Sequence, residues 1–299
     1  MSDQNNSVFE QRVASLRELL DQNDLDALIV SHDDEYLSYE LNEDEERLKY
    51  ITGFSGSAGY AVITSNDLKI NEENIEINQD NTENGIVVDR DCAVFVDGRY
   101  VVQVKEQIDS DIFQDFDLAK VKPAKWISSV MPKNSTVGID INCISYKEYI
   151  SIKNELGMNN INLVATESNL VDKIWTDKPA PVISEISIFP DEYNGCPSPQ
   201  KRQLIAQTLR DKDLDATVIC DPESICWLLN IRGKDRAYLP VINCKMVAYS
   251  NEALEWYINP NHFKDENLQD QLQEHIGHID IFPEEAFDDV LDRLCSSSC

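Results

Sequence analysis

Residues 16–31 read LRELLDQNDLDALIVS, and residues 205–220 repeat the pattern as IAQTLRDKDLDATVIC. The tetrapeptides Asp24–Ala27 and Asp213–Ala216 are identical, and the apolar positions around them correspond. Each copy is typical of an amphipathic helix, a short polar turn and a buried strand of about five residues, which together open an α/β unit. Because the copies begin 189 residues apart, too far for a solenoid repeat, the sequence predicts two similar globular domains in tandem.

The length and composition fit two domains and exclude several classes of partner. With 299 residues, 42% of them hydrophobic, the chain is long enough for two ordinary cores. Its 55 acidic and 26 basic residues give a net charge of −29, which repels nucleic acid and anionic membranes. The polar N-terminus does not resemble a signal peptide, and no stretch has the roughly 20 apolar residues that span a bilayer. We therefore expect a cytoplasmic protein.

Short apolar runs alternate with helical patterns along the rest of the chain, which favours layered α/β sheets. The expected strands are Gly59–Thr64, Cys92–Val96, Thr136–Asp140, Lys245–Ser250, Glu255–Ile258 and Ile279–Phe282, and the expected helices include 101–108, Ser145–Leu156 and Ser224–Leu229. A capping box at Ser7–Glu10 predicts the start of the first helix. The acidic stretch 66–91 forms either a small exposed hairpin or a long surface loop.

Proline-rich segments mark the boundary between the domains. Lys178–Pro181 and Cys196–Pro199 cannot continue a helix. We therefore expect a first domain over residues 1–176, a linker over residues 177–199 and a second domain over residues 200–299.

The cysteines and histidines do not predict a metal site. Most of the eight cysteines, such as Cys92 and Cys226, have the pattern of small buried apolar residues in a reducing compartment. Cys295 and Cys299 lie in a polar tail. They are either a pair of metal ligands or two thiols of a terminal segment that can oxidise. His275-Ile-Gly-His278 could place two ligands on one face, but a third ligand is not near in the sequence.

The segment Gly53–Gly59 reads GFSGSAG and is followed by an expected strand. A phosphate-binding loop would need a lysine and a following helix, so this class of site is not predicted. The glycines are expected to allow tight packing or a turn before the strand. A nucleophilic Ser55 or Ser57 would need a base, and no histidine is close in the sequence.

Two motifs that contain arginine are the candidate binding sites. Asp97–Tyr100, DGRY, follows a buried strand and is either a simple strand-end turn or a rigid turn that presents the Arg99 guanidinium to a carboxylate. Arg232–Arg236, RGKDR, is a basic island in an acidic chain. It is either a loop that faces a partner or ligand, or a structural cluster of ion pairs.

Taken together, these segments resemble the Xaa-Pro aminopeptidases (aminopeptidase P) in their long, three-domain form. In chain order the matching segments are Tyr36–Ser38, Arg47–Gly59, Asp97–Tyr100 with Gln103, Asn169–Trp175, and Ile225–Asp235 with Pro240 and Val241. The similarity covers about residues 10 to 260, and the stretch 66–91 departs from the family's usual short connection. The resemblance implies an α/β fold of two tandem creatinase/prolidase N-terminal-like domains, each a mixed sheet with helices on both faces. In the family, a catalytic pita-bread domain follows them.

The resemblance also implies an activity that resides outside this chain. In the family, the third domain holds two divalent metals, usually manganese, which activate a bridging hydroxide against the Xaa-Pro bond. We therefore expect a parent metallo-aminopeptidase for peptides with proline at the second position, and no catalytic residue, cofactor or metal ligand in this chain. The resemblance implies that Arg99 reaches towards the substrate, with Tyr100 and Arg232 as weaker candidates, and it allows a homo-oligomer.

Two hypotheses follow from the sequence. In the first, the chain is the N-terminal two-domain part of a cytoplasmic Xaa-Pro aminopeptidase, inactive alone, which supplies substrate-facing and assembly surfaces. In the alternative, it is a natural, catalytically empty relative that acts as a binding or assembly module. Whether the reading frame continues past Cys299 separates the two hypotheses.

Overall fold

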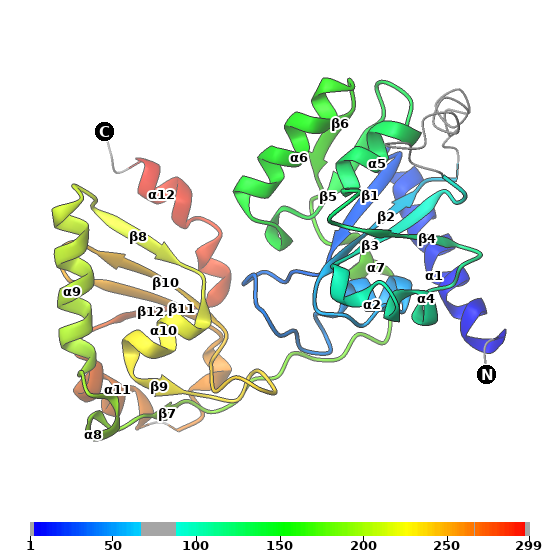
Figure 1. Ribbon diagram of the computed structural model, residues 1–299. Coiled ribbons are helices and arrows are strands. Elements are labelled where there is room, and N and C mark those ends of the chain that lie inside the picture. Colours follow the sequence, from blue (N-terminus) through cyan, green and yellow to red (C-terminus); the bar gives the residue numbers. More distant parts are fainter. Residues whose placement is uncertain (1–2, 67–87, 266, 297–299) are drawn as a thin grey trace. The chain divides into compact units, whose positions relative to one another are not determined.

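The computed structural model describes residues 3–66, 88–265 and 267–296 (Figure 1). The chain divides into two compact units, unit 1 from Met1 to Pro179 and unit 2 from Ala180 to Cys299. The sequence-based boundaries at 176, 177–199 and 200 stay a prediction. The expected hairpin or loop at 66–91 lies almost entirely outside the described residues.

Unit 1 is built on a six-stranded mixed sheet with the strand order β4-β3-β2-β1-β5-β6. Its strands are β1 (Ala27–Ser31), β2 (Gly59–Thr64), β3 (Cys92–Val96), β4 (Phe113–Asp117), β5 (Thr136–Ile139) and β6 (Asn162–Ala165). β1 is antiparallel to β2 and parallel to β5. The carboxyl ends of β1 and β5 therefore lie at the same edge of the sheet.

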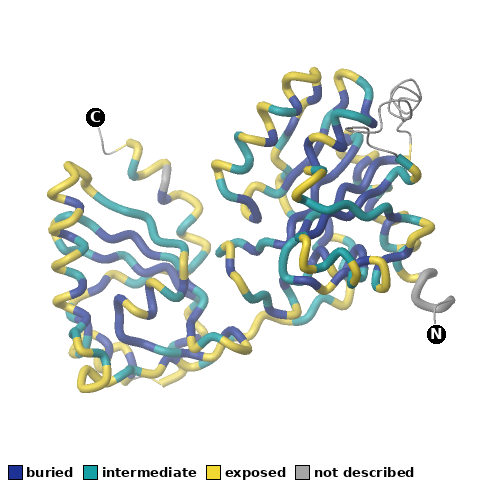
Figure 2. Tube along the Cα trace, in the orientation of Figure 1, coloured by how far each residue is buried: buried dark blue, intermediate teal, exposed yellow. Residues whose placement is uncertain are grey.

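Helices cover both faces of this sheet (Figure 1). They are α1 (Asp3–Gln22), α2 (Arg47–Thr52), α4 (Gln103–Gln107), α5 (Pro123–Val130), α6 (Tyr146–Met158) and α7 (Leu170–Ile174). Leu28 and Val30 of β1 enter the core formed with α1, α2 and α7, whereas Ile29 enters the core formed with α5 and α6. This alternation is the period of a strand buried on both faces, and the central strands β1, β2 and β3 are accordingly mostly dark blue in Figure 2.

Unit 2 contains a four-stranded sheet with the order β12-β11-β10-β8 and a separate pair of strands, β7 and β9. The elements are β7 (Ser187–Ile188), α8 (Asp191–Asn194), α9 (Ser198–Asp211), β8 (Ala216–Ile219), α10 (Pro222–Leu229), β9 (Ile231–Arg232), β10 (Cys244–Tyr249), β11 (Leu254–Ile258), α11 (Leu268–Ile276), β12 (Asp280–Phe282) and α12 (Val290–Ser296). Trp256 packs with α10 and α11 on one face, and Tyr257 packs with Val290 on the other. The predicted α/β class, with mixed sheets between helices, is confirmed in both units.

The repeated stretch forms the same helix, turn and strand in each unit. After α1 and after α9, Asp24 (φ +53°) and Asp213 (φ +55°) adopt the left-handed conformation. The next N–H, that of Leu25, donates back to the carbonyl oxygen of Leu20 at 3.0 Å, and the matching bond in unit 2 is 2.9 Å. The chain thus leaves each helix by the same turn and enters the sheet, which confirms the predicted duplication.

Two details differ from the sequence-based expectation. The first copy is a buried strand, but β8 is only half-buried, because β1 lies between two strands and β8 lies at the edge of its sheet. The predicted capping box at Ser7 is wrong, because α1 begins at Asp3 and Ser7 is inside the helix. The other predicted strands are confirmed, and the expected helix at 101–108 is shorter than predicted, because only α4 (Gln103–Gln107) is helical there and a separate 3-10 turn (Gly98–Tyr100) precedes it.

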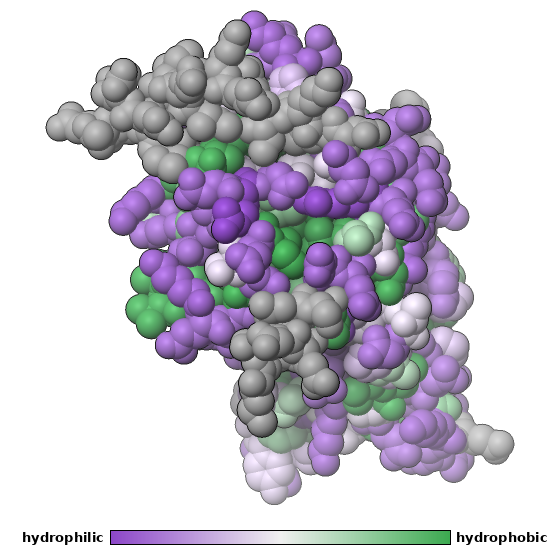
Figure 3. Space-filling view, turned by 90° about the vertical axis from the view of Figure 1, so that its right-hand side faces the viewer, coloured by the Kyte–Doolittle hydropathy of each residue, from purple (hydrophilic) through white to green (hydrophobic). Residues whose placement is uncertain are grey.

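In Figure 3, hydrophilic residues cover most of the visible face, with smaller hydrophobic areas between them. None of the helices in the described ranges is both long enough and apolar enough to cross a membrane.

The left-handed turns provide a test of the fold. A β-branched residue in this conformation is strained by about 1–2 kcal/mol, whereas glycine is not. We therefore expect Asp24→Val, and likewise Asp213→Val, to lower the free energy of unfolding by about 1–2 kcal/mol in urea titrations. Asp24→Gly should stay within about 0.5 kcal/mol of the unchanged protein. Asp21→Val, at an exposed helical position of α1, is the control; an equal loss there would contradict the assignment of strain to the turn.

Candidate functional site

A tight turn after β3 holds Arg99 at the surface of unit 1. Asp97 caps the 3-10 turn, and its Oδ1 accepts hydrogen bonds from the Arg99 backbone N–H at 3.0 Å and from Nε at 2.8 Å. The hydrogen bonds to Asp97 and then to Tyr39 raise the pKa of Arg99. The side chain is nevertheless 57% exposed, so a charged guanidinium is held in one orientation and remains accessible to solvent.

The glycine-rich segment 53–59 packs against the same turn. The Tyr100 hydroxyl lies 2.6 Å from Ser57 Oγ, and its ring meets the Phe54 ring edge-on with the centroids 5.6 Å apart. A Cβ added to Gly56 would lie 2.3 Å from the Phe54 ring and 2.9 Å from the Tyr100 ring. Glycine is therefore needed for this close approach, which confirms the packing role predicted for these glycines.

The serines of this segment are held in hydrogen bonds to α4 and to the turn. Ser55 Oγ accepts from Gln107 Nε2 at 2.8 Å and from Gln103 Nε2 at 3.3 Å, and the Ser55 N–H donates to Gln107 Oε1 at 3.0 Å. Ser57 Oγ is engaged by Tyr100. Both hydroxyls therefore join the segment to its neighbours, and neither faces a histidine as a nucleophile would.

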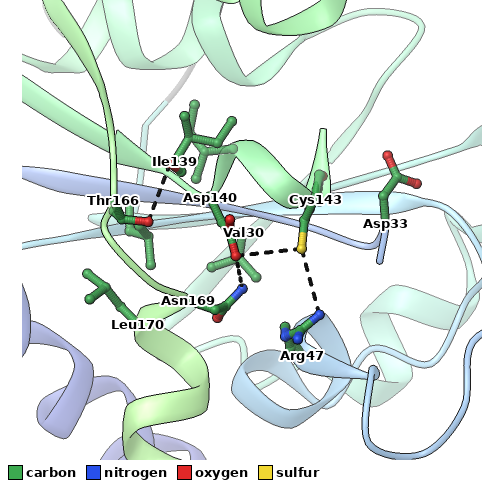
Figure 4. A pocket seen from close by; sticks show the side chains of 12 residues that line it. Val30, Asp33, Arg47, Ile139, Asp140, Cys143, Thr166, Asn169 and Leu170 are labelled. Carbon is green, nitrogen blue, oxygen red and sulfur yellow. Dashed lines mark hydrogen bonds between the residues drawn. The ribbon is translucent and has the colours of Figure 1, made fainter. Parts of the chain in front are cut away.

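A small cavity lies at the carboxyl ends of β1 and β5, the edge at which open α/β sheets bind ligands. Its polar lining includes Asp33, Arg47, Asp140, Cys143 and Asn169 (Figure 4). Asn169 Nδ2 donates to Asp140 Oδ2 at 2.9 Å. The volume is about 10 Å³, which is room for about one water molecule. A peptide does not fit in this cavity.

Arg47 occupies the wall of this cavity in a network of charges. Its Nε and Nη2 each lie 2.9 Å from an oxygen of Asp172, and Nη2 lies 2.7 Å from Glu35 Oε1. Arg47 is 5% exposed, and its Nη1 contacts Cys143 Sγ at 3.7 Å. Burial, followed by the charges of Glu35 and Asp140, raises the pKa of the Cys143 thiol. The bidentate pair joins α2 to α7, and the neutral thiol beside it is not a reactive nucleophile.

Asp33 lies beside the same cavity among other acidic groups. Burial, with the nearby charges of Glu148 and Asp34, raises the pKa of Asp33 to about 6. Glu148 accepts a hydrogen bond from the Tyr60 hydroxyl at 2.5 Å and so remains close to this cluster. The surroundings at the end of β1 therefore disfavour the charged form of the Asp33 carboxyl group.

In unit 2 the basic island is anchored by a buried carboxylate. Asp235 is 1% exposed, and its Oδ1 accepts from the Ser184 N–H at 2.8 Å and from Ser184 Oγ at 2.7 Å. Its Oδ2 accepts from the Asn243 N–H at 2.7 Å and lies 3.4 Å from His262 Nε2. Because the serine hydroxyl donates to the aspartate and not to the histidine, the three residues are a structural bridge and do not form a catalytic triad.

The five residues of the island have different environments. Asp235 and Arg236 are buried and hold the loop. The Arg232 guanidinium lies 4.5 Å from the centre of the Phe189 ring, and Lys234 is exposed. The structural interpretation therefore fits Asp235 and Arg236, whereas a ligand-facing role for the other residues of the motif, Arg232 included, stays a prediction.

The described residues do not fit a metal centre. Among them, no group of three or more His, Cys, Asp or Glu side chains is placed to hold a metal ion. His275 Nε2 lies 3.3 Å from the Asn230 carbonyl oxygen, and His278 lies 3.3 Å from Asp280. Cys295 is exposed, and Cys299, its partner in the metal pair considered from the sequence, lies outside the described residues. No metal-dependent step is therefore assigned to these side chains.

The family relationship is consistent with this geometry. The creatinase/prolidase N-terminal domain family matches the chain twice, at residues 12–79 and at residues 177–298. The chain therefore belongs to this family and carries two such domains in tandem, one in each unit.

The individual relatives are Xaa-Pro aminopeptidases. The Xaa-Pro aminopeptidase ApepP of Drosophila melanogaster is 29% identical over 91% of this chain and 42% of its own length. A probable Xaa-Pro aminopeptidase P of Talaromyces marneffei is 31% identical over 89% of this chain and 36% of its own. The crystal structure of an X-prolyl aminopeptidase from Caenorhabditis elegans matches 97% of this chain and 45% of that chain, with a TM-score of 0.82 and 22% identity. The chain thus spans less than half the length of these relatives.

The titration of Asp33 predicts a pH-dependent stability. The pKa of Asp33 in the folded protein, about 6, lies above its ordinary value of 3.8. The contribution of Asp33 to the free energy of unfolding is therefore complete below about pH 4 and is lost as the pH rises through 6. We expect Asp33→Asn to raise the thermal midpoint at pH 7.5 and to change it little at pH 4. The exposed Asp177→Asn is the control. A stabilisation by Asp33→Asn that is the same at both pH values would contradict the assignment.

Proposed function

We propose that this chain is the N-terminal, non-catalytic region of a Xaa-Pro aminopeptidase. The parent enzyme hydrolyses the N-terminal Xaa-Pro bond through two-metal activation of water, and the two units supply substrate-facing and assembly surfaces, including those of a homo-oligomer. Support comes from the similarity to Xaa-Pro aminopeptidases along 89–91% of the chain. The Caenorhabditis elegans relative is described as a cytosolic enzyme with a di-nuclear active site, which supports a cytoplasmic location and a pair of divalent metals in the parent enzyme. We propose manganese as that metal.

A dedicated enzyme for such peptides has a physical reason. Proline has no amide N–H and its φ is fixed near −65°, so a cleft that pairs with an extended peptide backbone rejects it. Binding must then depend more on charged groups at fixed positions around the peptide. An accessible guanidinium on a rigid turn is a group of this kind.

The observation that carries the proposal for this chain is the Arg99 turn. Asp97 orients the guanidinium, and the close packing of the Tyr100 ring beside Gly56 and Phe54 supports the turn. We propose that Arg99 contacts the peptide substrate. Tyr100 and Arg232 are weaker candidates, because the Tyr100 hydroxyl is engaged by Ser57 and Arg232 rests on the Phe189 ring.

The activity is tested by comparing residues 1–299 with the longer protein encoded by the same reading frame. We expect the longer protein to release the first residue from a peptide with proline at the second position, to lose this activity on dialysis against EDTA, and to regain it with manganese. The 299-residue chain alone should show no release. A reading frame that stops at Cys299 would favour the alternative of a catalytically empty binding module, and activity of the 299-residue chain would contradict the proposal.

Arg99→Ala in the longer protein tests the substrate contact. The loss of a hydrogen bond from a charged donor, about 1.5–3 kcal/mol, predicts a decrease in kcat/KM of roughly 10- to 100-fold. The thermal midpoint should change little, because the exposed pair with Asp97 contributes little to stability. Arg90→Ala, which removes another exposed arginine with a carboxylate partner on unit 1, should leave the kinetics unchanged. Equal kinetics for Arg99→Ala and Arg90→Ala would remove Arg99 from the site.

A further inference from the structure

Unit 2 contains an open groove beside the loop that follows β9. Its volume is about 830 Å³, within the range of ligand sites in proteins. The groove is lined by the segments Ser184–Ser187, Arg232–Lys234 and Arg236–Pro240, together with Lys264. These segments are brought together by the β7–β9 pairing and by the Asp235 anchor.

The lining is unusually cationic for this chain. Arg232, Lys234 and Lys264 line the groove, and none of them forms an ion pair with a carboxylate in the described part of the chain. Arg236 is buried, and Glu185 is the acidic residue of the lining. In a protein with 55 acidic and 26 basic residues, three cations around one groove without carboxylate partners form a local positive field.

The loop that carries two of these cations is held rigidly. A Cβ added to Gly233 would lie 1.9 Å from the Ile242 side chain, so the backbone approaches that side chain closely. The Lys234 N–H donates to Ser184 Oγ at 2.7 Å, and the same hydroxyl donates to the buried Asp235. The Arg232 guanidinium is supported by the Phe189 ring. The backbone of this loop and the Arg232 guanidinium are therefore held in place before a ligand binds, which reduces the entropy lost on binding.

The groove also offers apolar and aromatic contacts. Ile186, Leu239 and Pro240 belong to its lining, and Tyr238 is 83% exposed. An exposed tyrosine beside aliphatic surface and cations suits a ligand that has both a backbone and charged side chains. A bare inorganic anion would leave this apolar lining unused.

We propose that this groove binds a short acidic peptide segment through its carboxylates. Arginine pairs with carboxylates in a bidentate geometry, and the two lysines add point charges. The net charge of −29 does not prevent this, because at physiological salt the field of remote charges is screened over about 8 Å. A long polyphosphate, in contrast, would extend from the groove over the acidic surface. The proposal concerns unit 2 alone and does not depend on peptidase activity.

The test uses the whole 299-residue chain and fluorescence anisotropy. The probe is a rhodamine-labelled pentapeptide of alternating glutamate and alanine, compared with the same peptide in which glutamine replaces glutamate. We expect the acidic peptide to bind, the glutamine peptide to bind at least tenfold more weakly, and the affinity to fall as salt rises from 50 to 500 mM. The double variant Lys234→Gln with Lys264→Gln should weaken binding about tenfold.

The matched control is the double variant Lys153→Gln with Lys212→Gln, which removes two exposed lysines away from the groove. It changes the net charge by the same amount and should leave the affinity unchanged. Equal losses in the two double variants, equal binding of both peptides, or no binding of the acidic peptide would overturn the proposal. Displacement of the peptide by submillimolar inorganic phosphate would also overturn it, since the site would then be one for phosphate. Circular dichroism melts confirm that each variant is folded.

Discussion

Both units depend on one backbone constraint, a single residue in the left-handed conformation between a helix (α1 in unit 1, α9 in unit 2) and the strand that follows it. Asp24 and Asp213 end the helices that precede them, and the N–H of the next residue donates a hydrogen bond to a carbonyl oxygen near the end of the helix. The strand then starts with a fixed direction and a fixed alternation of side chains. A shift of one residue here would exchange the residues of β1 between its two cores. In unit 1 the register of this turn therefore determines which side chains of β1 enter each core.

Buried polar side chains then fix segments that are distant in the sequence. Arg47 joins α2 to α7 through Asp172, and Asp235 joins the loop after β9 to Ser184 and His262. Each group has several polar partners, so removing one of them would leave the buried charge less well compensated. The loop of unit 2 that carries the exposed Lys234 is thus anchored by interior contacts that are costly to break.

Local patterns in the sequence predicted those features of the fold that depend on residues close to one another in the chain. The duplicated helix and strand, the strands themselves and the tight packing at Gly56 all follow from periodicity or residue size, and the structure has them. The pairing of Arg47 with Asp172 and the place of His262 beside Asp235 were not predicted, because no local pattern records contacts between distant segments. The half-buried state of β8 was missed for a similar reason, since the position of a strand at a sheet edge is a property of the assembled sheet.

The two cationic turns differ in a way that matters for recognition. In unit 1, Asp97 touches Arg99 directly at the surface, so the carboxylate offsets much of the positive field and leaves an oriented donor. Such a group favours a single contact of defined geometry. In unit 2, the anchoring Asp235 is fully buried, whereas Lys234 is exposed without a carboxylate partner in the described part of the chain. Its positive field is therefore less compensated at the surface, which favours attraction of several carboxylates over recognition of one.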